Sequence, residues 1–253
     1  MNAETEGVVL KHIKAVNGRK MILLFSKKYG KISAATGGSE KGKNRFALAL
    51  KPFTHGRYDL FKGRDIFNIN SAEVIKAYYK IGEDVEKYMC ASFILEFTER
   101  ILPENMPSVE LFRLLLDFFD LIEARKKKYT TLVIAYQLKA IQLMGLAPEL
   151  LCCVRCGAKE DLAFFDVKQG GAICVGCRNN ITGSDDELIY ILNSDIINPL
   201  LYFLGNNLKS VGHLALDDTI STEIQDIIRE YRAYHLCIKE IKSEDFLKKY
   251  QGG

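Results

Sequence analysis

The chain has 253 residues, of which 48% are hydrophobic and 26% charged, so it has the composition of an ordinary globular protein with room for two or three small domains. Its apolar runs are shorter than the roughly 18 residues of a membrane-spanning helix, and residues 1–7 carry two glutamates in place of the apolar core of a secretory signal. Seven cysteines, an odd number, argue against a closed disulfide framework and favour a reducing cytoplasm.

The net charge of +3 is unevenly distributed along the chain. Residues 1–80 contain 16 basic and 6 acidic residues, a net charge of +10, so the remaining residues carry −7. This asymmetry indicates that the N-terminal part meets a polyanion while the rest does not. A lysine-rich, solvated surface is the alternative.

The first 75 residues read as short strands separated by turn signals. Asn17-Gly18 and Tyr29-Gly30 are turn dipeptides, and residues 36–44 form a basic, glycine-containing loop. The predicted strands are Gly7–Val16, Met21–Phe25, Lys31–Ala35, Phe46–Phe53, Arg57–Phe61 and Ile66–Ile69. So many short strands in so short a stretch predict a small closed barrel.

After Ser71 the apolar period becomes helical. A first helix is expected to bury Val85, Tyr88, Met89, Ser92 and Leu95 and to end before Pro103, and Ser108 is expected to cap a second helix. A third helix is predicted over 130–144, with Gly145 as its C-terminal signal.

Two more helical segments are predicted near the C-terminus. The apolar stretch 186–204 is the first, and a capping box at Thr222–Gln225 opens a long helix over 223–242. The apolar stripe of that helix includes Tyr231, Ile238 and Ile241, and His235 within it is interpreted as a packed residue rather than a ligand.

Two CxxC pairs predict a metal site. Cys153 and Cys156 are separated from Cys174 and Cys177 by 17 residues, a spacing typical of tetrahedral four-cysteine zinc sites. With four sulfur ligands, one structural Zn²⁺ per chain is expected, with no open position for a substrate. The alternatives are four buried thiols, two disulfides, or Cys152 as the first ligand in place of Cys153.

The remaining cysteines are assigned to other places. Cys90 and Cys237 lie on apolar helical faces, so both are predicted to be core thiols. The zinc segment is expected to cover residues 149–180.

The sequence lacks the common catalytic motifs. Phosphate-binding loops, dinucleotide fingerprints, HExxH and GxSxG are not found, and the four histidines are scattered. A non-enzymatic binding protein is therefore predicted. A zinc-dependent hydrolase is the alternative among enzymes. It would need an open ligand position on the metal, and four thiolate ligands leave none. A zinc-ribbon scaffold subunit of a transcription or translation complex is the alternative.

Several stretches together resemble the RecO family of bacterial recombination mediators. The more specific ones are the cysteine segment and Leu50–Phe53. The others are 7–10, 24–26, 29–30, 37–45, 164–165, 234–236, 242–243 and 246–247. The turn at Lys14–Lys20 departs from the family, in which acidic residues are common there.

The resemblance implies an α+β multidomain protein. An oligonucleotide-binding (OB) β-barrel over residues 1–80 would be followed by a helical domain over 81–253, interrupted by the zinc segment. It also implies a DNA repair protein of the bacterial cytoplasm and nucleoid that binds single- and double-stranded DNA and anneals single strands. Together with RecR, it would help RecA to replace single-strand-binding protein (SSB).

The basic N-terminal part supplies candidate phosphate contacts, and Phe46 and Tyr58 are candidates to stack on bases or to fill the barrel. The phosphate candidates are Lys27, Lys28, Lys31, Lys41, Lys43, Arg45 and Arg57. The acidic SSB tail, which the family resemblance assigns to the helical part, needs an apolar pocket rimmed by cations. Its candidates are Arg229, Arg232 and Lys239.

Overall fold

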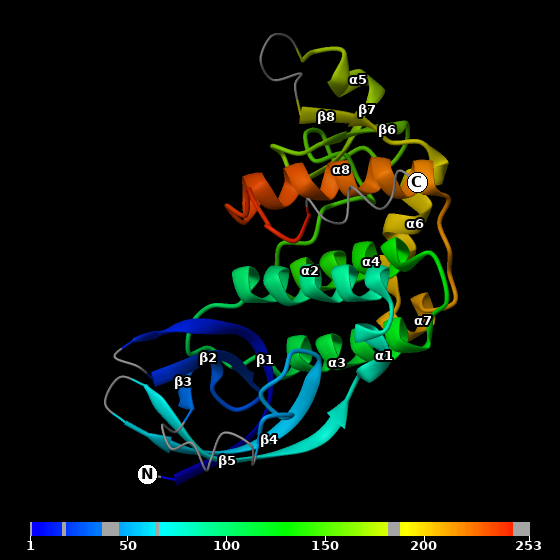
Figure 1. Ribbon diagram of the computed structural model, residues 1–253. Coiled ribbons are helices and arrows are strands. Elements are labelled where there is room, and N and C mark those ends of the chain that lie inside the picture. The colour runs from blue at the N-terminus through cyan, green and yellow to red at the C-terminus, as the bar shows by residue number, and fades with distance from the viewer. Residues whose placement is uncertain (1, 17–18, 37–45, 64–65, 182–187, 245–253) are drawn as a thin grey trace. The chain divides into compact units, whose positions relative to one another are not determined.

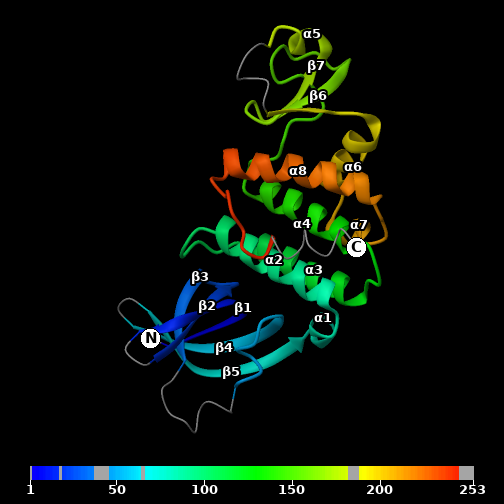
Figure 2. The same cartoon turned by 45° about the horizontal axis from the view of Figure 1, so that its top comes forward.

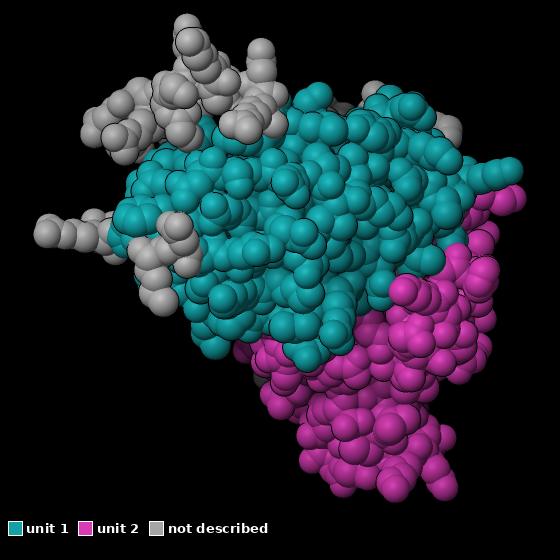
Figure 3. All heavy atoms as spheres, turned by 90° about the horizontal axis from the view of Figure 1, so that it is seen from below, with its two compact units in different colours: residues 1–126, 242–253 teal, residues 127–241 magenta. Residues whose placement is uncertain are grey.

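The computed structural model describes residues 2–16, 19–36, 46–63, 66–181 and 188–244 (Figure 1). These residues fall into two compact units: residues 1–126 with the segment from residue 242, and residues 127–241 (Figure 3). Among the helices of the described ranges, none is both long enough and apolar enough to cross a membrane. The division at residue 80 follows the change from strands to helices and stays a prediction.

Five strands of the first unit form a closed sheet. They are β1 (Asn2–Val16), β2 (Arg19–Ser26), β3 (Gly30–Thr36), β4 (Thr54–Lys62) and β5 (Phe67–Ala77). Their hydrogen-bonded order is β1-β2-β3-β5-β4, and β1 also pairs with β4, so the sheet closes into a barrel. The β3–β5 pairing is parallel and the others are antiparallel. The predicted barrel is confirmed.

The barrel interior contains the alternate side chains of its strands, as the period of two requires. Val9, Ile22, Leu24, Ile32 and Leu60 are almost fully buried in one cluster. The antiparallel pairing of Val16 with Arg19 supports the predicted β1–β2 hairpin, although its tip, residues 17–18, lies outside the described residues.

The predicted strand Phe46–Phe53 is wrong. These residues form turns, in which the Leu50 N–H donates to the Phe46 carbonyl and Phe53 has a left-handed φ of 57°. Pro52 lacks the N–H that a strand ladder needs. The Ala49 carbonyl accepts a 2.5 Å hydrogen bond from the Tyr58 hydroxyl, so the turn segment packs against the barrel core.

The first unit also contains the helices α1 (Tyr79–Gly82), α2 (Val85–Ile101) and α3 (Val109–Ala124). The predicted cap of α3 is confirmed, because the Ser108 hydroxyl accepts from the Leu111 N–H. The predicted buried face of α2 is partly wrong, since Val85 and Tyr88 are 57% and 50% exposed. Because α2 contacts β1, α1 and α3, it buries residues on several of its sides, Phe97 among them.

The second unit combines helices with a small sheet (Figure 2). Its helices are α4 (Tyr129–Leu143), α5 (Val175–Arg178), α6 (Ser194–Gly205), α7 (Leu208–Val211) and α8 (Asp218–His235). The strands β6 (Leu162–Asp166), β7 (Gly171–Cys174) and β8 (Ile189–Ile191) form a sheet in the order β7-β6-β8. The predicted helix 186–204 is therefore only partly confirmed, because Ile189–Ile191 form β8 and the helix α6 begins at Ser194.

The boundaries of α8 also differ from the prediction. The helix starts one turn earlier than Thr222, after Asp217, whose side chain accepts from the Thr219 N–H. It ends at His235 rather than Lys242, because Cys237 has a left-handed φ of 56° and the Ile238 N–H turns back to the Arg232 carbonyl.

The chain beyond this turn still packs. Ile238 and Ile241 are buried without being helical, whereas Cys237 is exposed, so the predicted core thiol there is wrong. Cys90, in contrast, is buried as predicted.

Candidate metal centre and nucleic-acid interface

Four cysteine sulfurs come together in the second unit. The Sγ atoms of Cys153, Cys156, Cys174 and Cys177 all lie within 4.8 Å of one another. The first pair precedes β6, Cys174 ends β7, and Cys177 lies in α5. Cys152 is outside the group, so the described structure favours Cys153 as the first ligand. All seven cysteines are free, which contradicts the two-disulfide alternative.

A tight hairpin brings the two pairs together. Strands β6 and β7 are antiparallel, with Leu162 paired to Cys174 and Asp166 to Gly171. A Cβ atom on Gly171 would lie 2.3 Å from the Glu149 carbonyl oxygen, so only glycine permits this approach. The Glu149 carbonyl in turn accepts from the Ala172 N–H at 2.7 Å, which fixes the segment before the first cysteine pair against β7.

Backbone N–H groups point at the sulfurs. The Cys174 N–H donates to Cys153 Sγ and the Cys177 N–H to Cys174 Sγ, each at 3.4 Å. Burial disfavours a thiolate at Cys153, but N–H groups of Cys174, Cys156 and Arg155 outweigh it and lower the pKa of this thiol to about 6. Hydrogen bonding to Cys156, followed by burial, raises the pKa of Cys177 to about 12. The N–H groups thus favour the thiolate at Cys153, and a bound cation would favour thiolates at all four ligands.

An apolar shell surrounds the sulfurs. Ile173 and Ile181 are buried beside them, and Leu162 and Phe164 pack against the same cluster. Four sulfur ligands in a tight group suit a tetrahedral, thiolate-preferring ion, and they leave no ligand position open. The group can hold a metal ion and has the donor set of a structural rather than a catalytic site.

The described candidate phosphate contacts lie on the barrel, and most of them are engaged within the protein. Lys27 Nζ lies 2.7 Å from the Glu6 carboxylate and Arg57 Nε 3.3 Å from that of Glu4. Lys31 Nζ donates to the Glu99 carbonyl at 2.9 Å. Lys41, Lys43 and Arg45 lie outside the described residues.

Of the two roles predicted for Tyr58, stacking on a base is wrong and filling the barrel is confirmed. Tyr58 is fully buried in the barrel, and burial raises the pKa of its hydroxyl well above the usual range. Phe46 is half-buried and packs against the same core. Sequence reasoning did not single out Lys62 or Phe67, which line a cavity with Lys28 and Tyr29. No local motif joins these residues, because Lys28 and Tyr29 lie in the turn after β2, whereas Lys62 ends β4 and Phe67 begins β5.

The three candidates for the SSB tail lie in different environments. Arg232 is 1% exposed, and its guanidinium donates to Gln137 Oε1 at 3.4 Å, so it cannot rim an accessible pocket. Arg229 Nη1 lies 2.8 Å from Asp226 Oδ1, whereas Lys239 is exposed beyond the end of α8.

His235 is packed as predicted. Its Nε2 lies 2.6 Å from the Val167 carbonyl oxygen, and its ring centroid lies 4.3 Å from that of Tyr231.

Comparison with known proteins identifies the family. The family model described as Recombination protein O N terminal matches residues 1–78, and Recombination protein O C terminal matches residues 82–245. Proteins named DNA repair protein RecO are similar over nearly their whole length. The protein from Thermoanaerobacter sp. (strain X514) is 32% identical over 98% of both chains, and that from Caldanaerobacter subterraneus is 32% identical over 97% of both. The protein from Alkaliphilus metalliredigens is 29% identical over 98% of this chain and 100% of its own.

These names describe a DNA repair protein and state no enzymatic reaction, which agrees with the predicted non-enzymatic role. The family models together cover almost the whole chain, including the barrel and the four-cysteine cluster. The chain therefore belongs to the RecO family of DNA repair proteins.

Proposed function

We propose that this chain is a DNA-binding recombination mediator whose N-terminal barrel holds single-stranded DNA and anneals complementary strands. The observation that carries the proposal is the closed five-stranded barrel within the region of the N-terminal family match. A small five-stranded barrel is the architecture of oligonucleotide-binding folds, and it occurs here in the part of the chain with a net charge of +10.

The proposed mechanism is electrostatic. Lysine and arginine side chains on the barrel would contact phosphates along one strand, releasing counterions. The neutralised, extended strand would then repel a complementary strand less, so pairing would become faster. Contacts to phosphate carry no sequence information, and binding is therefore expected to be indifferent to sequence.

The partners proposed for this chain are RecR and SSB, with RecA loaded as SSB is displaced at the nucleoid. Support comes from membership of the RecO family and from the charge division, since residues 81–253 carry a net charge of −7 and are better suited to proteins than to DNA. Lys239 and Arg229 stay candidates for the SSB tail. Titrating a labelled tail peptide into the protein and into Lys239→Glu tests this, and equal affinities would place the site elsewhere.

The metal proposed for the cysteine cluster is one structural Zn²⁺ per chain. Cys153, Cys156, Cys174 and Cys177 would hold it, and its bonds would stabilise the segment 149–180.

An annealing assay tests the main function. Complementary oligonucleotides coated with SSB should pair faster when the protein is added. Lys41→Ala, Lys43→Ala and Arg45→Ala combined should weaken single-strand binding and flatten the slope of log K against log salt by about 2, from about 0.7 per lost phosphate contact. The matched control removes three cations from the helical part: Arg125→Ala, Lys126→Ala and Lys127→Ala. No annealing by the wild-type protein would refute the proposal.

A further inference from the structure

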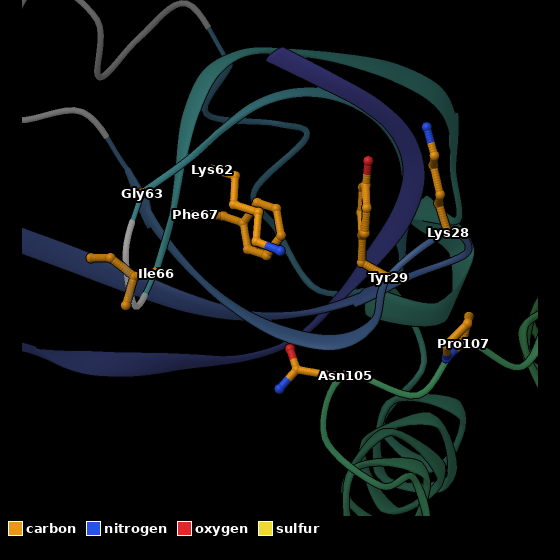
Figure 4. Close-up of a pocket in the computed structure, with 8 residues that line it drawn as sticks. All are labelled: Lys28, Tyr29, Lys62, Gly63, Ile66, Phe67, Asn105 and Pro107. Atoms are coloured by element: carbon orange, nitrogen blue, oxygen red, sulfur yellow. The ribbon is translucent and has the colours of Figure 1, made fainter. Parts of the chain in front are cut away.

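A cavity opens at the end of the barrel where the β2–β3 turn meets the β4–β5 connection. Its volume is about 380 Å³, within the range of roughly 300–1,000 Å³ that is usual for ligand sites. We call this cavity the barrel-end pocket. None of the described residues that line it is acidic (Figure 4). They are Lys28, Tyr29, Lys62, Gly63, Ile66, Phe67, Asn105 and Pro107.

Two aromatic rings and two ammonium groups define the chemistry of the pocket. The ring centroids of Tyr29 and Phe67 are 5.3 Å apart, with the planes inclined at 39°. Lys28 Nζ lies 5.5 Å from the centroid of the Tyr29 ring, and Lys62 Nζ lies 5.9 Å from that of Phe67. Figure 4 shows the ring of Tyr29 edge-on, between Lys28 on one side and Phe67 with Lys62 on the other.

The two rings have different roles in the packing. Phe67 is 7% exposed and belongs to the barrel core, whereas Tyr29 is half-buried and packs against that core from its edge. Phe67 therefore supports the Tyr29 ring from behind, and Tyr29 is the ring that can offer a face to a ligand.

The wall opposite the strands is fixed by backbone contacts. The Asn105 N–H donates to the Lys31 carbonyl at 3.1 Å, and Lys31 forms a bridge with Glu104. Gly30, with a φ of +71°, lies against the Met106 backbone so closely that a Cβ atom would be 2.2 Å from the Met106 oxygen. The segment carrying Asn105 and Pro107 is thus held against β3, and the pocket is preformed.

The lysines of the pocket differ from the neighbouring cations in their contacts. Lys27 and Arg57 are within 2.7 Å and 3.3 Å of glutamate oxygens, so part of their charge is already neutralised. Lys28 and Lys62 are exposed, and their ammonium groups lie near aromatic rings. A ligand that joins a flat apolar group to negative charge matches this combination, because rings stack on rings and phosphates pair with ammonium groups.

We propose that the barrel-end pocket holds one unpaired base of a single DNA strand against Tyr29, with the flanking phosphates at Lys28 and Lys62. This inference rests on the proposed single-strand binding and adds a specific site for a base. The ammonium group of Lys28 leaves the tyrosine ring for a phosphate as the base packs there. A base held in this way is taken out of its own strand's stack, and a duplex offers no such base.

The test uses an oligothymidylate carrying a single 2-aminopurine, whose fluorescence falls when it stacks on an aromatic ring. The wild-type protein should quench the probe. Tyr29→Leu should abolish quenching and weaken binding about 5- to 150-fold, the range that corresponds to the loss of one stacked base. Tyr29→Phe keeps the ring and should behave like the wild type, which separates stacking from packing of the barrel edge.

The cations are tested separately. Lys28→Ala with Lys62→Ala should reduce the steepness of the salt dependence by about 1.4, from about 0.7 per phosphate contact. Lys51→Ala with Lys80→Ala is the matched control, since it removes the same charge from exposed positions of residues 1–80 that do not line the pocket. A smaller change in the pocket variant than in the control would overturn the assignment of the phosphates.

The outcomes distinguish the two proposals. Tight binding of DNA by the wild type with unchanged affinity and quenching in Tyr29→Leu would overturn the base site and leave the proposed function standing. Absence of DNA binding by the wild type would overturn both. Quenching of the free 2-aminopurine nucleotide as strong as that of the oligonucleotide would overturn the assignment to a DNA strand and identify a mononucleotide pocket.

Discussion

Gly30 and Gly145 form a natural pair for testing how the barrel holds its neighbouring segment. Both have left-handed backbones, with φ of +71° and +76°. A Cβ atom at Gly30 would lie 2.2 Å, 2.4 Å and 2.7 Å from three backbone atoms of Met106, whereas at Gly145 it would meet nothing within 4 Å. Alanine at either position therefore meets the same conformational penalty, and only Gly30→Ala adds a collision with backbone.

The expected magnitudes follow from these contacts. Holding alanine in the left-handed region destabilises the folded protein by about 1–2 kcal/mol. Alanine also restricts the unfolded chain more than glycine does, which stabilises the folded protein by about 0.4–1 kcal/mol. Gly145→Ala should therefore lower the free energy of unfolding by about 1 kcal/mol. Gly30→Ala should lower it by about 2–4 kcal/mol, because overpacking adds about 1–3 kcal/mol.

Hydrogen exchange is the suitable assay, since the two compact units need not open together. Gly30→Ala should speed exchange in β2 and β3, and Gly145→Ala at the end of α4. Single-strand affinity should fall only in Gly30→Ala, because the displaced segment carries Asn105 and Pro107 of the barrel-end pocket. Equal destabilisation by the two variants would refute the reasoning, since it would mean that the Met106 backbone yields freely.

Three further predictions concern the metal, the pH dependence and the interior of the second unit. Elemental analysis should find one zinc per chain in the wild type and in Cys152→Ser but little in Cys174→Ser, and equal zinc in both variants would contradict the ligand assignment. A hydrogen bond from a neighbouring lysine holds the pKa of Glu6 below its usual value, and burial lowers that of His55. Because the unfolded chain then binds protons more readily, stability of the first unit should fall as the pH drops below about 6.5 and again below about 4.5. Glu6→Gln should remove mainly the second loss, and an unchanged urea-unfolding profile against pH would contradict this. Arg232→Glu should lower the stability of the second unit by about 3–5 kcal/mol, measured by exchange in α4 and α8, because it breaks a buried polar contact and leaves a charge in the interior.

Residue spacing predicted those features that depend on local chemistry. The two CxxC pairs indicated the sulfur cluster, since turn geometry places neighbouring cysteines on one ion, and Ser108 marked the start of α3 through a contact three residues away. Short apolar segments between turn signals indicated most of the barrel strands in the same way.

Features set by contacts between distant segments could not be read from spacing. Residues 46–50 form a short apolar run like that of a strand, but the Ala49 carbonyl accepts a hydrogen bond from the Tyr58 hydroxyl and the segment forms turns. The exposed position of Tyr88 on α2 depends on which sides of the helix its neighbours cover. Tyr29 precedes β3 and Phe67 begins β5, the neighbouring strand of the barrel, so their contact joins segments distant in sequence and the candidate base site had no signature there.

The closure of the barrel limits how a protein partner can be recruited. In the described residues, β2 pairs with β1 and β3 over Met21–Ser26, and β4 pairs with β1 and β5 over His55–Phe61, so neither strand presents an open edge there. A peptide that docks by adding a strand to a sheet gains its affinity from the backbone and tolerates many sequences. This route is closed along those two strands, so a protein that binds there has to be recognised through side chains. Binding of a partner there is therefore expected to depend on individual side chains, and single substitutions on either side of that contact should change the choice of partner.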